Sequence, residues 1–270
     1  MRRVLPPSGL KVYLTHCLRR VPELVRSRSL ECIDARMDGI QELTYRGAKL
    51  HINLGVVDSL LPTGDAPTFS GIREMYARDV YLRFFRPERL RWKDVVDAGA
   101  NRGLFSLFAA TLAERVFWVE AQEAYLEAFR SLLVGHALHA EVVPVVGTLR
   151  PDNVAIPLPL TWTAIMPPGT GDNGFSMSEL LTRYGMKSVS FLKMDIEGAE
   201  FPVLKCSSPW LGAVENIAME VHAEAGNPNE IVDLLRSAGF AVTAADSDLH
   251  RVGKDGLASY VYASRTGTLR

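Results

Sequence analysis

Apolar and polar positions follow a regular rhythm from about residue 94 to the end of the chain. Short uninterrupted apolar runs alternate there with segments in which apolar residues recur every three or four positions. The runs predict strands, and the recurring pattern predicts helices. Strands are predicted at 95–96, 116–119, 142–146, 189–194, 217–221, 240–244 and 258–263, and helices at 104–113, 123–136, 178–184, 199–205 and between Asn227 and Gly239. Because strands alternate with helices, the pattern indicates a parallel sheet covered on both faces.

The two ends of the chain modify this picture. The last two predicted strands are joined by a turn around 254–256, so we expect an antiparallel final strand in a seven-stranded, mostly parallel, doubly wound α/β sheet. Before the regular rhythm, 41–54 predict a hairpin around Arg46-Gly47, and 69–85 predict a helix. We therefore divide the chain into an N-terminal helix and hairpin extension, 1–68, and a main domain, 69–270.

A basic helix is predicted over residues 9 to about 28. It carries apolar and basic side chains together: Val12, Leu14, Leu18, Val21 and Leu24, with Arg19, Arg20, Arg26 and Arg28. We interpret it as a solvated helix packed on the domain. Contact with a membrane or a partner is the alternative.

The composition is that of a globular protein without a strong charge bias. Apolar residues make up 47% of the chain, and 30 Lys and Arg stand against 31 Asp and Glu, which argues against a nucleic-acid partner. Cys17, Cys32 and Cys206 have neither zinc-site nor disulfide spacing, as is typical of the cytoplasm. The most apolar stretch, 154–166, is too short for a transmembrane segment, and no secretory signal is recognisable.

Residues 154–174 depart from the rhythm, because they contain four prolines and the turn-forming run 169–174. Irregular apolar segments beside a strand-end site are typical of lids and binding walls. We expect Trp162, Phe175 and the run 169–174 to cover the bound acceptor. A packed surface loop or a contact between subunits is the alternative.

The first motif with chemical content is V-V-D-A-G-A-N-R-G, which spans Val95 to Gly103. A strand ends there and the chain turns into a helix, which is where open α/β sheets bind ligands. A dinucleotide site would have G-x-G-x-x-G to hold a pyrophosphate, whereas this turn has G-x-x-x-G and an acid. S-adenosylmethionine carries a sulfonium and an α-amino group and no phosphate, so an acid suits it. The predicted cofactor contacts in this motif are Asp97, Gly99, Ala100, Asn101 and Gly103.

Glu120 ends the second predicted strand. An acid at that position accepts hydrogen bonds from both ribose hydroxyls of a nucleotide. Dinucleotides and S-adenosylmethionine share this ribose, so Glu120 does not discriminate between them alone. Gly147 and Asp195 complete the predicted cofactor contacts.

Two further motifs follow at the ends of later strands. The run F-L-K-M-D-I-E-G-A-E brings Asp195, Glu197 and Glu200 to one strand end, and M-E-V-H brings His222 to the next. The macrodipole of the following helix accounts for Glu200, but three acids repel one another without a cation or a shared proton. A histidine beside such a cluster is a catalytic candidate. We predict Asp195, Glu197 and His222 as catalytic residues.

These motifs closely resemble the FkbM-like methyltransferases, over about residues 69–245. The run D-I-E-G-A-E at 195–200 is the most specific element. The resemblance implies a class I methyltransferase (Rossmann-like) fold, S-adenosylmethionine as the methyl donor, and O-methylation of a sugar or secondary metabolite. The sequence departs from the family at Ala121-Gln122, where proline usually follows the acid, and at Arg102, where an aliphatic residue is more usual.

We therefore expect an S-adenosylmethionine-dependent O-methyltransferase whose partner is a small-molecule hydroxyl acceptor. The alternatives are an N-methyltransferase, a nucleotide-dependent oxidoreductase and a module that binds the cofactor without catalysis. His222 or Asp195 would take the acceptor's proton as general base, or a divalent ion would lower the hydroxyl's pKa. We favour the base and predict no metal, because no spacing is specific for one. A homo-oligomer stays open.

Overall fold

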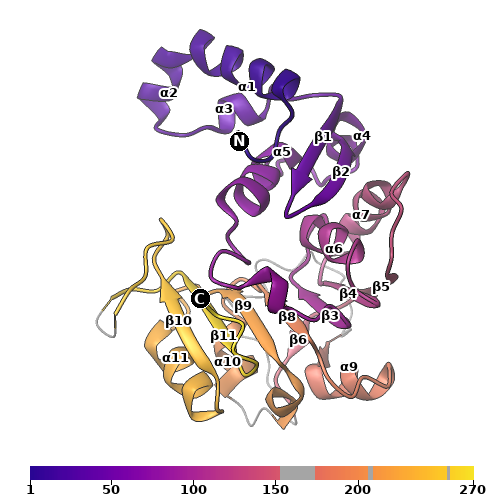
Figure 1. Cartoon of the computed structure of the whole chain (residues 1–270), viewed down its shortest axis with the longest axis vertical. Helices are drawn as coiled ribbons and strands as arrows, with labels where there is room; N and C mark the ends of the chain where they lie inside the picture. Colours follow the sequence, from indigo (N-terminus) through magenta and orange to yellow (C-terminus); the bar gives the residue numbers. More distant parts are fainter. Residues whose placement is uncertain (153–173, 206–208, 254–255) are drawn as a thin grey trace.

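A seven-stranded sheet organises the C-terminal part of the chain (Figure 1), in a computed structural model that describes residues 1–152, 174–205, 209–253 and 256–270. In sheet order its strands are β10 (Ala241–Ala245), β11 (Tyr260–Ser264), β9 (Asn216–Glu220), β8 (Phe191–Met194), β3 (Asp94–Ala98), β4 (Arg115–Glu120) and β5 (Glu141–Val146). Within this sheet β11 is antiparallel to both neighbours, and the other pairings are parallel. The predicted mostly parallel sheet with an antiparallel final strand is confirmed.

Alternate residues of each central strand face opposite sides of the sheet. Val95 and Phe191 belong to one hydrophobic cluster, whereas Val96 and Leu192 belong to a second. All four side chains are fully buried. Strands that are covered on both faces read as continuous apolar runs, which is why the sequence pattern could locate them.

The segments that cover the sheet and cap its edges follow the predicted order. They are α6 (Leu104–Ala110), the 3-10 turn η3 (Glu123–Tyr125), α7 (Leu126–Leu133), α9 (Met177–Arg183), α10 (Glu200–Lys205), the 3-10 helix η4 (Pro209–Ala213) and α11 (Pro228–Ser237). The side chain of Asn227 caps α11 as expected, by accepting a hydrogen bond from the Asn229 N–H at 3.1 Å. The predicted helix 123–136 is shorter, and its first turn is the 3-10 turn.

A short two-stranded sheet joins β6 (Leu149–Arg150) to β7 (Phe175–Ser176) in parallel. Phe175 is buried there. Trp162 and nearly all of the segment 154–174 lie outside the described residues, so the expectation that this segment covers an acceptor stays a prediction.

The N-terminal part consists of helices around a hairpin. Its elements are α1 (Pro7–Arg19), α2 (Val21–Ser27), α3 (Glu31–Asp34), β1 (Ile40–Tyr45), β2 (Ala48–Asn53), α4 (Leu54–Ser59), α5 (Thr68–Ile72), the π-helix η1 (Arg73–Arg78) and the 3-10 helix η2 (Pro87–Arg89). The hairpin is confirmed: β1 and β2 are antiparallel, and both turn residues, Arg46 and Gly47, have positive φ.

Two predicted N-terminal helices are wrong in extent. The helix over 9–28 is two helices with a break at Arg20, because Pro22 has no N–H to continue the helical hydrogen bonds. The helix over 69–85 ends at Asp79, which has φ +62°. The Asp79 carboxylate accepts hydrogen bonds from Tyr45 and Arg46 of the hairpin turn, so a tertiary contact ends this helix.

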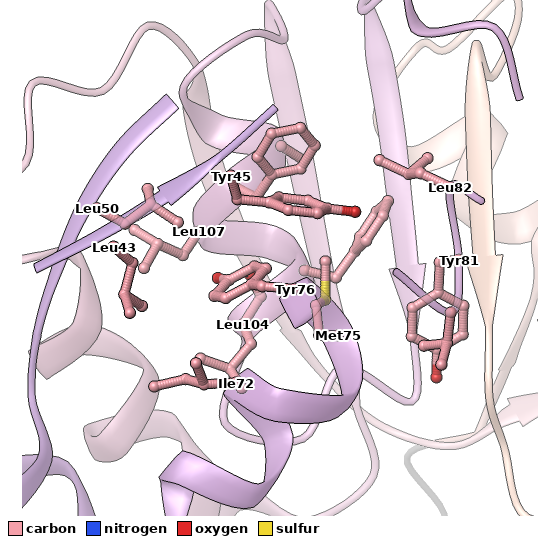
Figure 2. Packing of buried hydrophobic residues seen from close by; sticks show 14 of the residues in the cluster. Leu43, Tyr45, Leu50, Ile72, Met75, Tyr76, Tyr81, Leu82, Leu104 and Leu107 are labelled. Atoms are coloured by element: carbon pink, nitrogen blue, oxygen red, sulfur yellow. The ribbon is translucent and has the colours of Figure 1, made fainter. Parts of the chain in front are cut away.

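The hairpin packs directly on the main domain. Figure 2 shows Leu43 and Leu50 of the hairpin beside Leu107 of α6. These residues belong to the same hydrophobic cluster as the Val95 face of the sheet. The division at residue 68 therefore separates two sequence patterns that share one core.

Candidate cofactor and catalytic site

A pocket opens at the carboxyl ends of the central strands. Its lining comes from the ends of β3, β4, β5 and β8 and from the segments that follow them, up to the start of β6 and of α10: Gly99, Asn101, Val119, Glu120, Ala121, Gln122, Gly147, Thr148, Leu149, Asp195, Ile196, Glu197 and Ala199. This is where open α/β sheets bind ligands. The lining contains three acids and no lysine or arginine, so the pocket favours a positively charged ligand over a phosphate.

The loop after β3 requires glycine at two positions. Gly99 has φ +69°, and a Cβ there would lie 1.6 Å from the backbone oxygen of Asp195. Gly103 has φ +87°, and a Cβ there would lie 2.1 Å from the ring of Phe129. The two glycines let the loop pass close to β8 and α7.

Glu120 is built into the pocket wall. Its Oε2 accepts a hydrogen bond from the Asn101 N–H at 2.7 Å, and its Oε1 accepts one from the Gln122 N–H at 2.9 Å. Burial raises the pKa of this carboxyl group, and the two backbone donors oppose that shift. Each oxygen retains a lone pair, so the group can still accept hydrogen bonds from two ligand hydroxyls.

Asp97 does not line the pocket. Its side chain is 0% exposed, and its Oδ2 accepts hydrogen bonds from the N–H and the hydroxyl of Ser106 at 3.1 and 2.7 Å. A carboxylate with no exposed surface cannot touch a ligand. The prediction that Asp97 contacts the cofactor is therefore wrong, and Asp97 instead holds the start of α6 through Ser106. Ala100 and Gly103 are also absent from the lining, whereas Gly99, Asn101, Glu120, Gly147 and Asp195 belong to it.

Lys193 is a buried site residue that we did not predict. Its Nζ donates to the backbone oxygen of Gly99 at 2.6 Å and lies 3.3 Å from Asp97 Oδ1 and 3.8 Å from Asp195 Oδ2. Burial alone lowers the pKa of Lys193, but Asp97 and Asp195 outweigh it and the pKa lies above its ordinary value. The sequence did contain a clue to Lys193, because residues 193 and 195 point to the same face of an extended strand.

Asp195 has a second partner from the N-terminal side of the chain. Its Oδ2 accepts a hydrogen bond from the hydroxyl of Tyr81 at 2.9 Å, and the Lys193 ammonium lies 5.2 Å from the centre of the Tyr81 ring. In Figure 2 the Tyr81 hydroxyl points away from the surrounding hydrophobic cluster. No sequence signal connects residues this far apart.

His222 stands among three carboxylates. Its Nδ1 lies 3.1 Å from Oε1 of Glu200, a side chain with 0% exposure, and its Nε2 lies 3.4 Å from Glu197 Oε2 and 4.0 Å from Asp195 Oδ1. The hydrogen bond to Glu200 and the charges of all three acids raise the pKa of His222 to about 9, although burial acts in the opposite direction. The structure therefore brings together the three predicted catalytic residues.

One family model matches the part of the chain that contains His222 and its neighbouring acids. The family model described as the methyltransferase FkbM domain matches residues 172–242, which include Asp195, Glu197, Glu200 and His222. These residues are similar to the FkbM methyltransferase domain. The resemblance seen in the motifs is thereby confirmed, and S-adenosylmethionine is the cofactor of this domain. The loop 97–103 and Glu120 lie outside the matched residues.

The similarity of the chain to whole proteins is weak. No curated protein matches the chain. Solved structures similar to it include an O-methyltransferase from Bacillus cereus in complex with SAH (18% identity, 78% of this chain and 87% of that chain, TM-score 0.42) and a putative methyltransferase from Streptococcus mutans in complex with SAH (11% identity, 69% and 93%, TM-score 0.41). A third is phosphoethanolamine N-methyltransferase 1 from Haemonchus contortus in complex with phosphoethanolamine and S-adenosylhomocysteine (14% identity, 66% and 40%, TM-score 0.38).

The residues of the pocket fit S-adenosylmethionine. The Gly99 backbone leaves a cradle that a Cβ would fill, and Glu120 offers acceptors for ribose hydroxyls. Asp195 and Glu197 add negative charge for a sulfonium and an amino group. The seven-stranded, mostly parallel sheet with the antiparallel β11 agrees with the sheet expected from the resemblance.

Two more features belong to the site around His222. Burial raises the pKa of Glu220 to about 8, and Asp195 and Glu74 add to the shift. Ligand atoms of Asp195, Glu200 and His222 lie within 4.8 Å of one another, a separation that also suits a divalent ion.

Arg102 ties the N-terminal extension to the loop 97–103. Its guanidinium donates to the backbone oxygen of Ala66 at 2.7 Å and lies 3.8 Å from Asp65 Oδ2. Asp65 also accepts a hydrogen bond from Tyr125 at 2.7 Å. Arg102 therefore joins this loop to the N-terminal extension.

Proposed function

We propose that the FkbM domain transfers a methyl group from S-adenosylmethionine to a hydroxyl oxygen of a sugar, glycoside or secondary metabolite, with His222 as the general base. The Glu200–His222 pair carries the proposal. A buried carboxylate on one ring nitrogen fixes the orientation of an imidazole and leaves the other nitrogen to exchange a proton. That other nitrogen lies beside Asp195 and Glu197, which line the pocket.

The residues around the pocket divide the work of binding and proton transfer. Glu120 would accept hydrogen bonds from the ribose hydroxyls. The backbone at Gly99, Asn101 and Gly147 would contact the rest of the cofactor. When bound, S-adenosylmethionine supplies a methyl group on a positively charged sulfur that is already a good leaving group. The protein therefore has to position the acceptor and remove its proton.

The charge state of His222 makes the base strong and pH-dependent. With a pKa of about 9, the imidazole holds its proton at neutral pH, and the fraction able to accept a proton grows as the pH rises. A hydroxyl is a poor nucleophile until it loses its proton, so a base of high proton affinity suits it. Asp195 serves as a positioning residue in this proposal, because Tyr81 and Lys193 already hold its Oδ2.

N-methylation is the second candidate. The carboxylates of Asp195 and Glu197 would hold an ammonium group. An amine that has lost its proton is already a nucleophile, so it needs no strong base. The Glu200–His222 pair favours the hydroxyl, because its geometry serves proton removal. A metal-assisted mechanism would use Asp195, Glu200 and His222 as ligands instead.

A labelled-methyl transfer assay tests the proposal. Matched pairs of acceptors, each a sugar, glycoside or polyketide alcohol and its amino analogue, are offered to the wild type, His222→Asn and Glu200→Gln, with and without a chelator. We expect transfer to hydroxyls, a loss of about 10²–10⁴-fold in His222→Asn, and no effect of chelation.

Each other outcome points to a different function. Transfer to amines alone would establish the N-methyltransferase. Activity lost on chelation and restored by Mg²⁺ would establish a metal. Cofactor binding without transfer to either class would indicate a module that binds without catalysis.

A further inference from the structure

Helices α1 and α2 expose apolar side chains that the fold does not use. Leu14 and Leu18 of α1 are 45% and 76% exposed, and Val21 and Val25 of α2 are 49% and 72% exposed. The members of each pair are four residues apart and lie on one face of their helix. We call these four residues, with Lys11, Arg19, Arg26 and Arg28, the α1–α2 face.

The attachment of these helices to the domain lies elsewhere on their surface. Tyr13 is the buried residue of α1, and its ring lies 5.7 Å from that of Phe69. Helix α2 buries no residue at all. The exposed leucines and valines of α1 and α2 are therefore not part of the buried core. Several exposed apolar side chains on two adjacent helices indicate a binding surface.

Positive charge is concentrated in the N-terminal segment that contains these two helices. Residues 1–28 contain seven lysines and arginines and one acid, Glu23, so the segment carries +6 in a chain of net charge −1. Glu23 is paired with Arg20. In the described part of the chain, no ion pair within 4.0 Å involves Lys11, Arg19, Arg26 or Arg28. These cations are available to an outside anion.

We propose that the α1–α2 face docks on the surface of an anionic lipid bilayer. A helix that presents apolar side chains flanked by arginine lies in the membrane interface, with the apolar groups at the acyl boundary and the cations against lipid phosphates. A second copy of the chain would bring two segments of charge +6 together, so charge disfavours that occupant. The two helices lie at one end of the longest axis of the molecule, where a flat surface can reach them (Figure 1). None of the described helices has the length and apolar character of a membrane span, so the contact is peripheral.

Vesicle flotation of the full chain tests this docking. Vesicles of phosphatidylcholine alone are compared with vesicles that also contain phosphatidylglycerol, at low and at high salt. We expect binding to the anionic vesicles alone, and its loss at high salt because ions screen the arginines. Leu18→Ser combined with Val25→Ser should weaken the partition on the order of tenfold or more. Val134→Ser, at a residue 74% exposed and outside the face, is the matched control and should bind as the wild type does.

Circular dichroism of each variant verifies that it folds. No binding of wild type to anionic vesicles at low salt would overturn the docking, as would equal binding of the double variant. A dimer that the double variant abolishes, without vesicle binding, would assign the face to a second copy instead.

Discussion

Asp97 and Lys193 form an ion pair in the interior of the domain, beside the loop that follows β3. The Nζ of Lys193 lies 3.3 Å from Oδ1 of Asp97, and the side chains are 5% and 0% exposed. The two residues are register partners on β3 and β8. Because the same Nζ donates to the backbone oxygen of Gly99, the pair supports the loop that lines the pocket.

Breaking this pair should cost both stability and cofactor affinity. We expect Asp97→Asn or Lys193→Met to lower the free energy of unfolding by about 3–5 kcal/mol, because each leaves a buried charge without its partner. The double variant should lose less than the sum of the two. Urea denaturation measures the stability, and calorimetry with S-adenosylhomocysteine measures the affinity. Additive losses would show that the two residues act independently.

Glu120→Gln should weaken cofactor binding without unfolding the domain. The amide nitrogen of glutamine cannot accept a hydrogen bond, so one of the two backbone donors and one ribose hydroxyl lose their acceptor. The expected loss is roughly 2–4 kcal/mol of binding free energy. Calorimetry with S-adenosylmethionine measures it, and NAD serves as the comparison ligand. The exposed Glu123→Gln is the control and should bind normally. An unchanged affinity in Glu120→Gln would remove the ribose assignment.

Gly99→Ala should destroy the pocket, because the new Cβ would lie 1.6 Å from the Asp195 backbone oxygen. Gly185 is a matched control: its φ is +61°, but a Cβ there meets nothing within 4 Å. Gly185→Ala should therefore cost only about 1–2 kcal/mol of backbone strain. We expect thermal melting to show a larger loss for Gly99→Ala, together with loss of cofactor binding. Equal effects of the two substitutions would mean that the close approach to Asp195 is not required.

The rate of methyl transfer should rise with pH toward about 9 as His222 loses its proton. Glu200→Gln removes the largest cause of the raised pKa of His222, so the rising limb should move to lower pH. His222→Asn should be slow and show no such limb. The measurement is kcat as a function of pH for the three proteins. If kcat of Glu200→Gln rose at the same pH as that of the wild type, the rise would have to be assigned to a group other than His222.

Stability should fall as the solution becomes alkaline. The pKa of His222 is about 9 in the folded protein and about 6.5 when unfolded, so its stabilising effect is complete below about 6.5 and is lost as the pH rises through 9. The pKa of Glu220, raised to about 8, acts in the same direction: the folded state keeps a proton that the unfolded state releases above about pH 4.5. Glu220→Gln should therefore flatten the decline between about pH 5 and 8 in urea titrations. A decline of unchanged slope would contradict the assignment to Glu220.

Much of the site could be predicted because it lies at strand ends. Gly99, Asn101, Glu120, Gly147 and Asp195 follow or end apolar runs, and the carboxyl ends of parallel strands meet at one edge of the sheet. The catalytic trio could be predicted for the same reason, because β8 and β9 are neighbours and bring Asp195 and His222 to adjoining ends. Their roles in catalysis stay a prediction.

Local sequence patterns were enough to predict the seven strands of the main sheet, the glycine loop after β3 and the convergence of acids with a histidine. These properties depend on local periodicity and on backbone freedom, which neighbouring residues set. The burial of the Asp97 carboxylate against Lys193 depends instead on the pairing of β3 with β8, which places the two residues side by side. The tertiary structure also brings Tyr81, which is distant in sequence, to Asp195. It surrounds His222 with three carboxylates that favour its protonated form. A pairwise contact or a pKa depends on distances between segments that no local pattern encodes.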